Sequence, residues 1–407
     1  MSVRAFLDDE EHAHAVAARV RAAGFEAVVR RDRFAGEDDD EDRPWVVDTD
    51  APAVLVEVAV EEHDGWVEDL PEPTPAPAPL DLPAGPRRVK GHWSAAASAA
   101  PPRLAPMDQR LLLVHAHPDD ESIGQGATMA EYAARGTQVT LVTCTLGEEG
   151  EVLVPDLAHL ASDKEDGLGR HRITELANAM KELGVTDHRF LGGAGHFRDS
   201  GMVWAPEGHA TAGEDVKDGT FWRADLTAAA DLLVEIIREV RPQVLVTYDQ
   251  FGGYGHPDHI QAHRVATYAA ALAPVRSYRT ELGEPWEIDK IYWGAMSANR
   301  MREGLRRLRE AGDTTTFEGM DPDGPLPPFM VPDELLDAVV VADDFVDAKL
   351  RAMKAHATQI EVDGPFFALS NNLGSQVWGT EFFRLAKGTK GPTNDDGLET
   401  DLFAGLS

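Results

Sequence analysis

The apolar residues after position 109 form short continuous runs that are separated by helically spaced ones. Continuous runs of strand length lie at 110–117, 138–145, 188–192, 243–249 and 290–297. Segments with small or apolar residues at helical spacing lie at 121–136, 169–185, 223–242 and 256–273. Continuous apolar strands that are each followed by a helix are typical of a parallel sheet buried on both faces. The pattern therefore predicts an α/β fold, a Rossmann-like parallel sheet with helices on both faces.

Residues 1–70 have a different pattern. Strand-like runs lie at 3–7, 26–30 and 45–47, a helix is expected at 10–23, and an apolar, helical segment ends in EEHDGWVE. Residues 70–86 then read LPEPTPAPAPLDLPAGP, a composition that favours an extended linker over a packed core. We therefore expect three parts: a small α+β domain at 1–70, a Pro/Ala-rich linker at 71–108 and the larger domain at 109–407.

Composition and charge narrow the classes of function. The chain has 407 residues, of which 43% are hydrophobic, so it can bury a sizeable core. The formal charge of −33, including the acidic run EDDDED at 37–42, argues against nucleic-acid binding, which requires clustered Lys and Arg. The N-terminus lacks the pattern of a signal peptide, and no segment reaches the roughly 18 apolar residues of a membrane span. Since Cys144 is the only cysteine and lies in a strand-like run, we expect no disulfides. Together these features predict a cytoplasmic protein that binds neither membrane nor nucleic acid.

Two similar polar runs follow predicted strands. HAHPDDES occupies residues 115–122, and GGYGHPDHIQAH occupies residues 252–263. In each run Pro suits the first turn of a helix, where its missing N–H is not needed. Ligands of parallel sheets bind at the carboxyl ends of the strands, so both runs are expected at the same rim.

The residue types in these runs favour a metal site. His117 with Asp120, and His256 with His259, are three positions apart and can project to one side of a helical turn. Two imidazoles and a carboxylate suit a borderline cation such as zinc, whose catalytic sites use three protein ligands and leave a fourth position to water. Asp119 is then a spare carboxylate that can take a proton from water at the metal, and a spare imidazole can steady a developing oxyanion. The set predicts metal-assisted hydrolysis.

Several motifs together resemble one known family. They are HAHPDDES, VTCTLGEEGEV, LGGAGHFRDSGM, VTYDQFGGYGHPDHIQAH, HATQ, ALSNN and the terminal GLETDLFAGL. Residues from about 110 to 407 are similar to the LmbE-like (PIG-L) zinc deacetylases, above all to members that act in mycothiol biosynthesis. The resemblance implies an enzyme that removes the acetyl group from a small amino-sugar inositol, N-acetylglucosaminyl-inositol, with Zn²⁺ or Fe²⁺ as cofactor.

The resemblance also assigns roles to residues. It implies a general base, Asp119, and three metal ligands, which are His117, Asp120 and His259. It makes His256 the electrostatic stabiliser and a candidate for the general acid, tuned by Asp258, and Tyr254 a mobile residue that can polarise the acetyl carbonyl. Four further positions match the family's substrate pocket: Arg172, Asp199, Glu151 and Met202.

Neighbouring polar residues receive structural interpretations. Since His115 lies two positions before His117 on a buried strand, it is expected to support the site rather than to bind metal. His263 is expected to support the site or face solvent, Glu121 to cap a helix and Asp249 to orient a loop. The role of His356, in HATQ, stays open.

Other functions compete with deacetylation of this substrate. Mycothiol S-conjugate amidases and other N-acetyl sugar deacetylases share the metal motif, but a lysine expected of the amidases is replaced by Gly124 and Gln125. Residues 1–70 resemble ribonuclease E activity regulators of the B type, which have a ferredoxin-like fold. This part can therefore bind a protein partner, which would make the chain a regulator, or serve as a spacer or dimerisation module.

Overall fold

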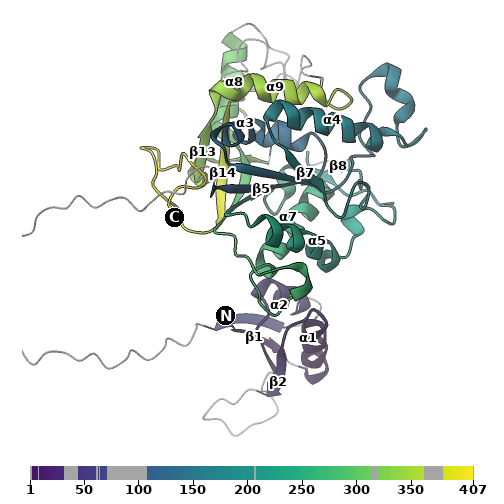
Figure 1. Cartoon of the computed structure of the whole chain (residues 1–407), viewed down its shortest axis with the longest axis vertical. Helices are drawn as coiled ribbons and strands as arrows, with labels where there is room; N and C mark the ends of the chain where they lie inside the picture. Colours follow the sequence, from purple (N-terminus) through teal and green to yellow (C-terminus); the bar gives the residue numbers. More distant parts are fainter. Residues whose placement is uncertain are drawn as a thin grey trace, which may run out of the picture. The chain divides into compact units, whose positions relative to one another are not determined.

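The computed structural model (Figure 1) describes residues 2–7, 9–31, 45–60, 63, 65–70, 108–205, 208–310, 312, 320–327, 329–361 and 379–406. The chain divides into two compact units, Met1–Pro102 with Ser277–Arg279, and Arg103–Arg276 with Thr280–Ser407. Three segments singled out in the sequence lie outside the described residues: 71–107 of the expected linker, the acidic run at 37–42, and ALSNN at 368–372.

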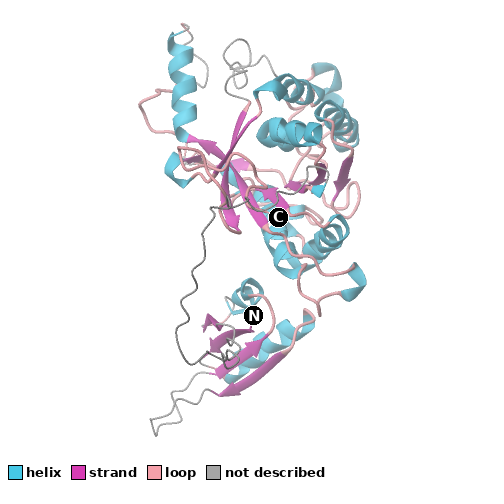
Figure 2. Ribbon diagram, turned by 60° about the vertical axis from the view of Figure 1, so that its left-hand side comes forward, coloured by secondary structure: helices cyan, strands magenta, loops and turns pink. Residues whose placement is uncertain are grey.

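The N-terminal unit contains a four-stranded antiparallel sheet with two helices packed on it (Figure 2). Its elements are β1 (Ser2–Leu7), α1 (Glu10–Ala22), β2 (Ala27–Arg31), β3 (Trp45–Thr49), α2 (Ala53–Val60) and β4 (Gly65–Leu70). The strand order β2-β3-β1-β4 is that of the expected ferredoxin-like fold. One expectation was wrong: Gly65–Leu70 is a strand rather than the end of a helix, because its backbone pairs with β1 along its whole length.

The larger unit contains an eight-stranded sheet in which five neighbouring strands, counted inward from one edge, are parallel. In spatial order these are β7 (Asp187–Phe190), β6 (Gln138–Thr143), β5 (Arg110–His115), β10 (Val244–Thr247) and β11 (Lys290–Ser297). Chain order reverses between β5 and β10, so the carboxyl ends of these two neighbours form the switch point at which such sheets bind ligands.

Helices cover both faces of this sheet, as the pattern predicted (Figure 1). One face carries α3 (Asp120–Arg135), α4 (Leu168–Leu183) and α9 (Val346–Ala355), and the other carries α5 (Leu226–Val240) and α7 (Pro257–Leu272). The other helices among the described residues of this unit are α6 (Gly252–Gly255), α8 (Ala298–Glu310) and 3₁₀ turns at Pro155–Leu160, Phe221–Arg223, Thr280–Leu282, Asp333–Leu335 and Asp343–Phe345.

One edge of the sheet differs from the expected all-parallel arrangement. There β14 (Thr380–Lys387) runs antiparallel between β11 and β13 (Ala338–Val341), and the short β12 (Met330–Val331) pairs with β11. A separate hairpin joins β8 (Val203–Trp204) to β9 (Ala210–Thr211). The parallel strands were recognisable from continuous apolar runs, whereas antiparallel edge strands depend on distant pairing partners.

The buried side chains agree with a structural role for the single cysteine. Cys144 directly follows β6, is 2% exposed, and burial raises the pKa of its thiol, which makes it a poor nucleophile. Within the described ranges, no helix combines the length and apolarity needed to cross a membrane.

Candidate metal and catalytic site

The two His-Pro-Asp runs meet at the switch point of the larger sheet. β5 ends at His115 and leads through a turn into α3, which begins at Asp120. The neighbouring strand β10 leads through α6 into α7, which begins at Pro257 with His256 as its N-cap. Because β5 and β10 pair in parallel, residues 140 positions apart in the chain face one another, as the sequence predicted.

Asp120 lies between two imidazoles. Its Oδ2 is 3.3 Å from His117 Nδ1, and its Oδ1 is 3.3 Å from His259 Nε2. The other ring nitrogen of His259, Nδ1, lies 3.2 Å from the Gly252 carbonyl and can only donate to it, which leaves Nε2 with a lone pair. This Nε2 is buried and has no hydrogen-bond partner within the described part of the chain. A lone pair that faces a carboxylate oxygen in this way suits a cation between them.

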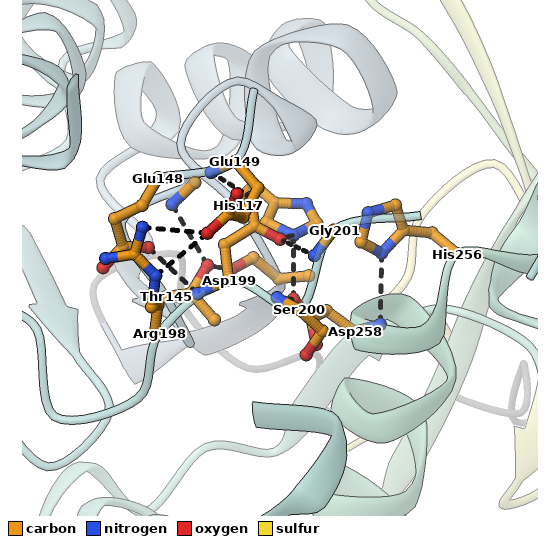
Figure 3. A network of polar contacts seen from close by, with 12 residues as sticks. His117, Thr145, Glu148, Glu149, Arg198, Asp199, Ser200, Gly201, His256 and Asp258 are labelled. Carbon is orange, nitrogen blue, oxygen red and sulfur yellow. Dashed lines mark hydrogen bonds and ion pairs between the residues drawn. The ribbon is translucent and has the colours of Figure 1, made fainter. Parts of the chain in front are cut away.

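Carboxylates also surround the other ring nitrogen of His117. Its Nε2 lies 3.3 Å from Asp258 Oδ2 and 3.5 Å from Asp199 Oδ1 (Figure 3). Two carboxylates around Nε2 favour a proton there, so Nδ1 is left to face Asp120. Burial raises the pKa of Asp199, but the nearby His117 outweighs it and holds that pKa below its usual range. His117 is therefore oriented by carboxylates in the way that metal-binding histidines usually are.

The contacts of Asp258 differ from the expected pairing with the His256 ring. Its carboxylate accepts hydrogen bonds from His117, from the backbone N–H of Ser200 at 2.9 Å and from the Ser200 hydroxyl. His256 is reached only through the Asp258 backbone N–H, which donates to His256 Nδ1 at 3.1 Å (Figure 3). The reason is the helix N-terminus: His256 caps α7 with its ring nitrogen, so the Asp258 side chain is free to turn toward His117.

His256 is thereby left with one free nitrogen, Nε2, which carries the proton in the neutral ring. Burial, and then the neighbouring His117 and His259, lower the pKa of His256 to about 2. Ligand atoms of these three histidines lie within 4.8 Å of one another, and so do those of His117, Asp199 and Asp258. Either group, beside the pair of imidazoles that face Asp120, could hold a metal ion here.

Asp119 stands apart from the metal-capable group. It precedes α3 and has φ 121° and ψ −34°, a backbone conformation rarely adopted by non-glycine residues. Its Oδ2 accepts a hydrogen bond of 2.8 Å from Arg172 Nη2. Burial raises its pKa to about 6, against the effect of Arg172, and Asp120 adds to the rise. A carboxylate with a pKa near neutrality suits a general base.

Aromatic rings surround the histidines on the side of α6. The ring of Tyr254 is centred 5.0 Å from that of His259 and 6.2 Å from that of His256. It also stacks on the ring of Trp204, which is 61% exposed and whose centroid is 6.1 Å away. Tyr254 thus lies half-buried beside the histidines of the site.

The four expected substrate residues divide into two pairs. Arg172 and Asp199 are buried and already bonded: Arg172 donates to Asp119, to the Gly147 carbonyl at 2.8 Å and to the Pro118 carbonyl, while Asp199 accepts the backbone N–H groups of Glu149 and Gly201 at 3.1 and 2.9 Å. Glu151 and Met202 are exposed. The first pair is therefore part of the framework that holds Asp119 and His117.

Sequence reasoning missed Tyr248, which links several site residues. Its hydroxyl donates to Asp120 Oδ2 at 2.8 Å, accepts the Ala116 N–H at 3.0 Å, and lies 3.1 Å from His115 Nδ1. The supporting role expected for His115 agrees with this contact. His263 Nδ1 lies 3.0 Å from the Tyr248 carbonyl.

Other polar residues tie the loops of the site together. Asp249 accepts the backbone N–H groups of Phe251 and Gly253, as expected of a loop-orienting residue. Glu121 accepts the Asp119 N–H at 2.9 Å, which agrees with a cap, and is 2.8 Å from His356 Nε2.

Comparisons with known proteins show which proteins the chain is similar to. The profile of the family described as "PIG-L: GlcNAc-PI de-N-acetylase" matches residues 112–270. The chain is 74% identical over 299 residues to the 1D-myo-inositol 2-acetamido-2-deoxy-α-D-glucopyranoside deacetylase of Nocardioides sp., covering 74% of this chain and 99% of the relative. The enzyme of the same name from Kribbella flavida is 69% identical, covering 74% of this chain and 98% of the relative. Among solved structures, N,N'-diacetylchitobiose deacetylase from Pyrococcus horikoshii matches with a TM-score of 0.45 and 18% identity, over 69% of this chain and 84% of that one.

Proposed function

The chain belongs to the PIG-L family, on the branch of the 1D-myo-inositol 2-acetamido-2-deoxy-α-D-glucopyranoside deacetylases, and we propose that it hydrolyses the acetamide of N-acetylglucosaminyl-inositol in mycothiol biosynthesis. The products are acetate and the free amino sugar. The observation that carries this proposal is the convergence of a metal-capable N/N/O group with a separate carboxylate, Asp119, whose pKa is about 6.

The ligand set that we favour is His117 Nδ1, Asp120 and His259 Nε2. Both nitrogens are left with lone pairs by the hydrogen bonds of their opposite ring atoms, and both lie 3.3 Å from the Asp120 carboxylate. His256 is the weaker candidate because its Nδ1 is used as a helix cap. Two nitrogens and one oxygen suit zinc, with iron(II) as the alternative. When bound, such a cation polarises the amide carbonyl and makes water acidic enough to lose a proton near neutral pH.

The protein groups then carry out the proton transfers. Asp119 takes the proton of the attacking water, and Arg172 keeps its carboxylate in place. The Nε2–H of His256 donates to the oxygen on which negative charge develops, and Tyr254 can approach the same oxygen from the side of α6. Asp119, once protonated, can return its proton to the amine as the C–N bond breaks.

The four expected substrate residues differ in whether they are free to contact a substrate. Glu151 and Met202, which are exposed, are available to contact the substrate directly. Arg172 and Asp199 can reach sugar or inositol hydroxyls only while they keep their bonds to the framework. We therefore expect substitutions of Arg172 to lower kcat as well as to raise KM.

The decisive test compares two substrates with the purified chain. We expect acetate release from N-acetylglucosaminyl-inositol with a higher kcat/KM than cleavage of a mycothiol S-conjugate. Chelation should abolish both activities, and zinc or iron(II) should restore them. The reverse preference would assign the chain to the amidases, and full activity in metal-free protein would refute the metal-dependent mechanism.

The N-terminal unit is assigned no catalytic role. All proposed site residues lie beyond residue 108, and the two relatives match 74% of the chain, so a quarter of it has no counterpart in them. We propose a cytoplasmic enzyme whose N-terminal unit binds a protein partner. Deletion of residues 1–105 should then leave a folded, active deacetylase, and loss of folding on truncation would contradict this division.

A further inference from the structure

The backbone of Asp119 needs to be held in place. Its φ of 121° lies in a region that is unfavourable for a residue with a side chain, and such conformations persist only when the surroundings fix them. Arg172 holds the carboxylate, but a carboxylate contact alone does not fix the peptide unit that precedes it. That peptide is held by the Asp119 N–H, which donates to Glu121 Oε2 at 2.9 Å.

Glu121 is in turn held by a residue from the far end of the chain. Its Oε1 accepts the Ser122 hydroxyl at 2.6 Å and lies 2.8 Å from His356 Nε2. Glu121 and His356 are both 0% exposed, although they are 235 positions apart. His356 Nδ1 has no hydrogen-bond partner in the part of the chain that the structure describes, so Glu121 is the only polar contact shown there for its ring.

The segment that carries His356 is fixed to the same helix that presents Arg172. Thr358 donates from its N–H and its hydroxyl to Glu175 of α4 at 2.9 and 2.7 Å. Glu175 lies three residues after Arg172, on the same side of α4. The Thr358 carbonyl also accepts the Leu153 N–H, in the loop that carries Glu151. The base is therefore connected to α4 through its side chain and, through Glu121 and His356, by its backbone.

We propose that His356 is a positioning residue for the general base: by bonding Glu121 it keeps the Asp119 peptide in the orientation that aims the carboxylate at the attacking water. The inference rests on the proposed function, since it takes Asp119 to be the base. This role would explain why the HATQ segment lies beside the site although none of its residues is a proposed metal ligand or substrate-binding residue.

The experiment replaces His356 in the full-length, metal-loaded protein. His356→Leu removes the donor to Glu121 at similar size, whereas His356→Gln keeps an N–H donor at about the position of Nε2. Because a misplacement of about 1 Å can cost ~10²-fold in rate, we expect His356→Leu to lower kcat by about that factor, with KM and metal content unchanged. His356→Gln should restore most of kcat.

A matched control tests general loosening of the segment. Thr358→Val removes one buried hydrogen bond to Glu175 but leaves the contact between His356 and Glu121. Because the Thr358 N–H still donates to Glu175, this variant should lower the melting temperature while kcat falls far less than in His356→Leu. The inference is overturned if His356→Leu keeps full kcat, if it loses metal in step with activity, if His356→Gln fails to restore kcat, or if Thr358→Val lowers kcat equally. A wild-type chain that releases no acetate would instead refute the proposed function itself.

Discussion

Removal of one hydroxyl, in Tyr248→Phe, tests how the metal-capable site is held. The Tyr248 hydroxyl makes three contacts, to Asp120 Oδ2, to the Ala116 N–H and to His115 Nδ1. Phenylalanine fills the same space and keeps the ring stacked on His259, whose centroid is 4.3 Å away. The substitution therefore removes a hydrogen bond to the proposed ligand Asp120 without removing any ligand.

The size of the effect follows from these contacts. In the variant, Asp120 Oδ2 keeps the hydrogen bond from the His117 backbone N–H, at 2.9 Å, but loses the one from the tyrosine hydroxyl. The orientation of the Asp120 carboxylate is therefore less firmly fixed. Loss of such a partner behind a ligand typically lowers metal affinity 10–100-fold, or about 1.4–2.8 kcal/mol. The Ala116 N–H is also left without its side-chain acceptor in a buried position, which should cost about 1–3 kcal/mol of unfolding free energy.

Tyr132→Phe is the matched control. The Tyr132 hydroxyl also donates to a carboxylate, Asp401 at 2.9 Å, and accepts a backbone N–H, from Leu402 at 2.8 Å, but none of these residues belongs to the site. Competition with a chromophoric chelator measures metal affinity, and thermal unfolding of metal-free protein measures stability. We expect both variants to lose stability and only Tyr248→Phe to lose metal affinity. Equal zinc affinities for the two variants would refute the supporting role of Tyr248.

Three further predictions concern the base, the ligand loop and pH. Asp119→Asn should retain metal and lower kcat by ~10²–10⁴-fold with KM little changed, whereas His259→Ala should lose metal. Elemental analysis and steady-state kinetics measure the two effects, and the opposite pattern would mean that base and ligand are wrongly assigned. Gly252→Ala and Gly253→Ala both place a side chain at positive φ, 63° and 69° respectively, but only at Gly252 would the new Cβ lie 2.7 Å from His259 Cβ. Only Gly252→Ala should therefore weaken zinc binding, by about tenfold or more in the chelator titration. Burial lowers the pKa of His356, but Glu121 outweighs this effect and raises that pKa above its usual value. The stability that the charged ring contributes is therefore fully present below about pH 6.5 and is lost as pH rises through the folded-state pKa. The melting temperature of His356→Gln should accordingly differ from that of the wild type more at pH 6 than at pH 9, and a constant difference would contradict this.

The position of the site could be predicted because it depends on local patterns. A continuous apolar run identifies a buried parallel strand, and HPDD or HPDH after it identifies the turn into the next helix. Parallel strands have their carboxyl ends at one edge, so two such turns on neighbouring strands must come together. Nothing beyond strand direction was needed to bring His117 and His259 to the same rim.

The supporting contacts could not be predicted because they join distant polar residues with no periodic pattern. Tyr248 is 128 positions from Asp120, and nothing in the sequence distinguishes its hydroxyl from other polar groups at the rim. His356 reaches Glu121 only because α9 packs against α3 and α4. The antiparallel strand β14 likewise depends on its insertion between β11 and β13. Tertiary packing, rather than local propensity, decides each of these partners.

The two motifs look equivalent in sequence, yet their histidines have different surroundings. The reason is that the carboxylate of each motif contacts a histidine of the other motif. Asp120 of the first motif faces His259 of the second, and Asp258 of the second orients His117 of the first. His256, the counterpart of His117, instead caps its own helix with Nδ1 and is left as a donor. Neither motif alone can assemble the N/N/O group, since each lacks the partner that the other supplies. The metal-capable group therefore exists only when β5 and β10 are paired, and metal binding must stabilise that pairing by the free energy with which it favours the folded chain.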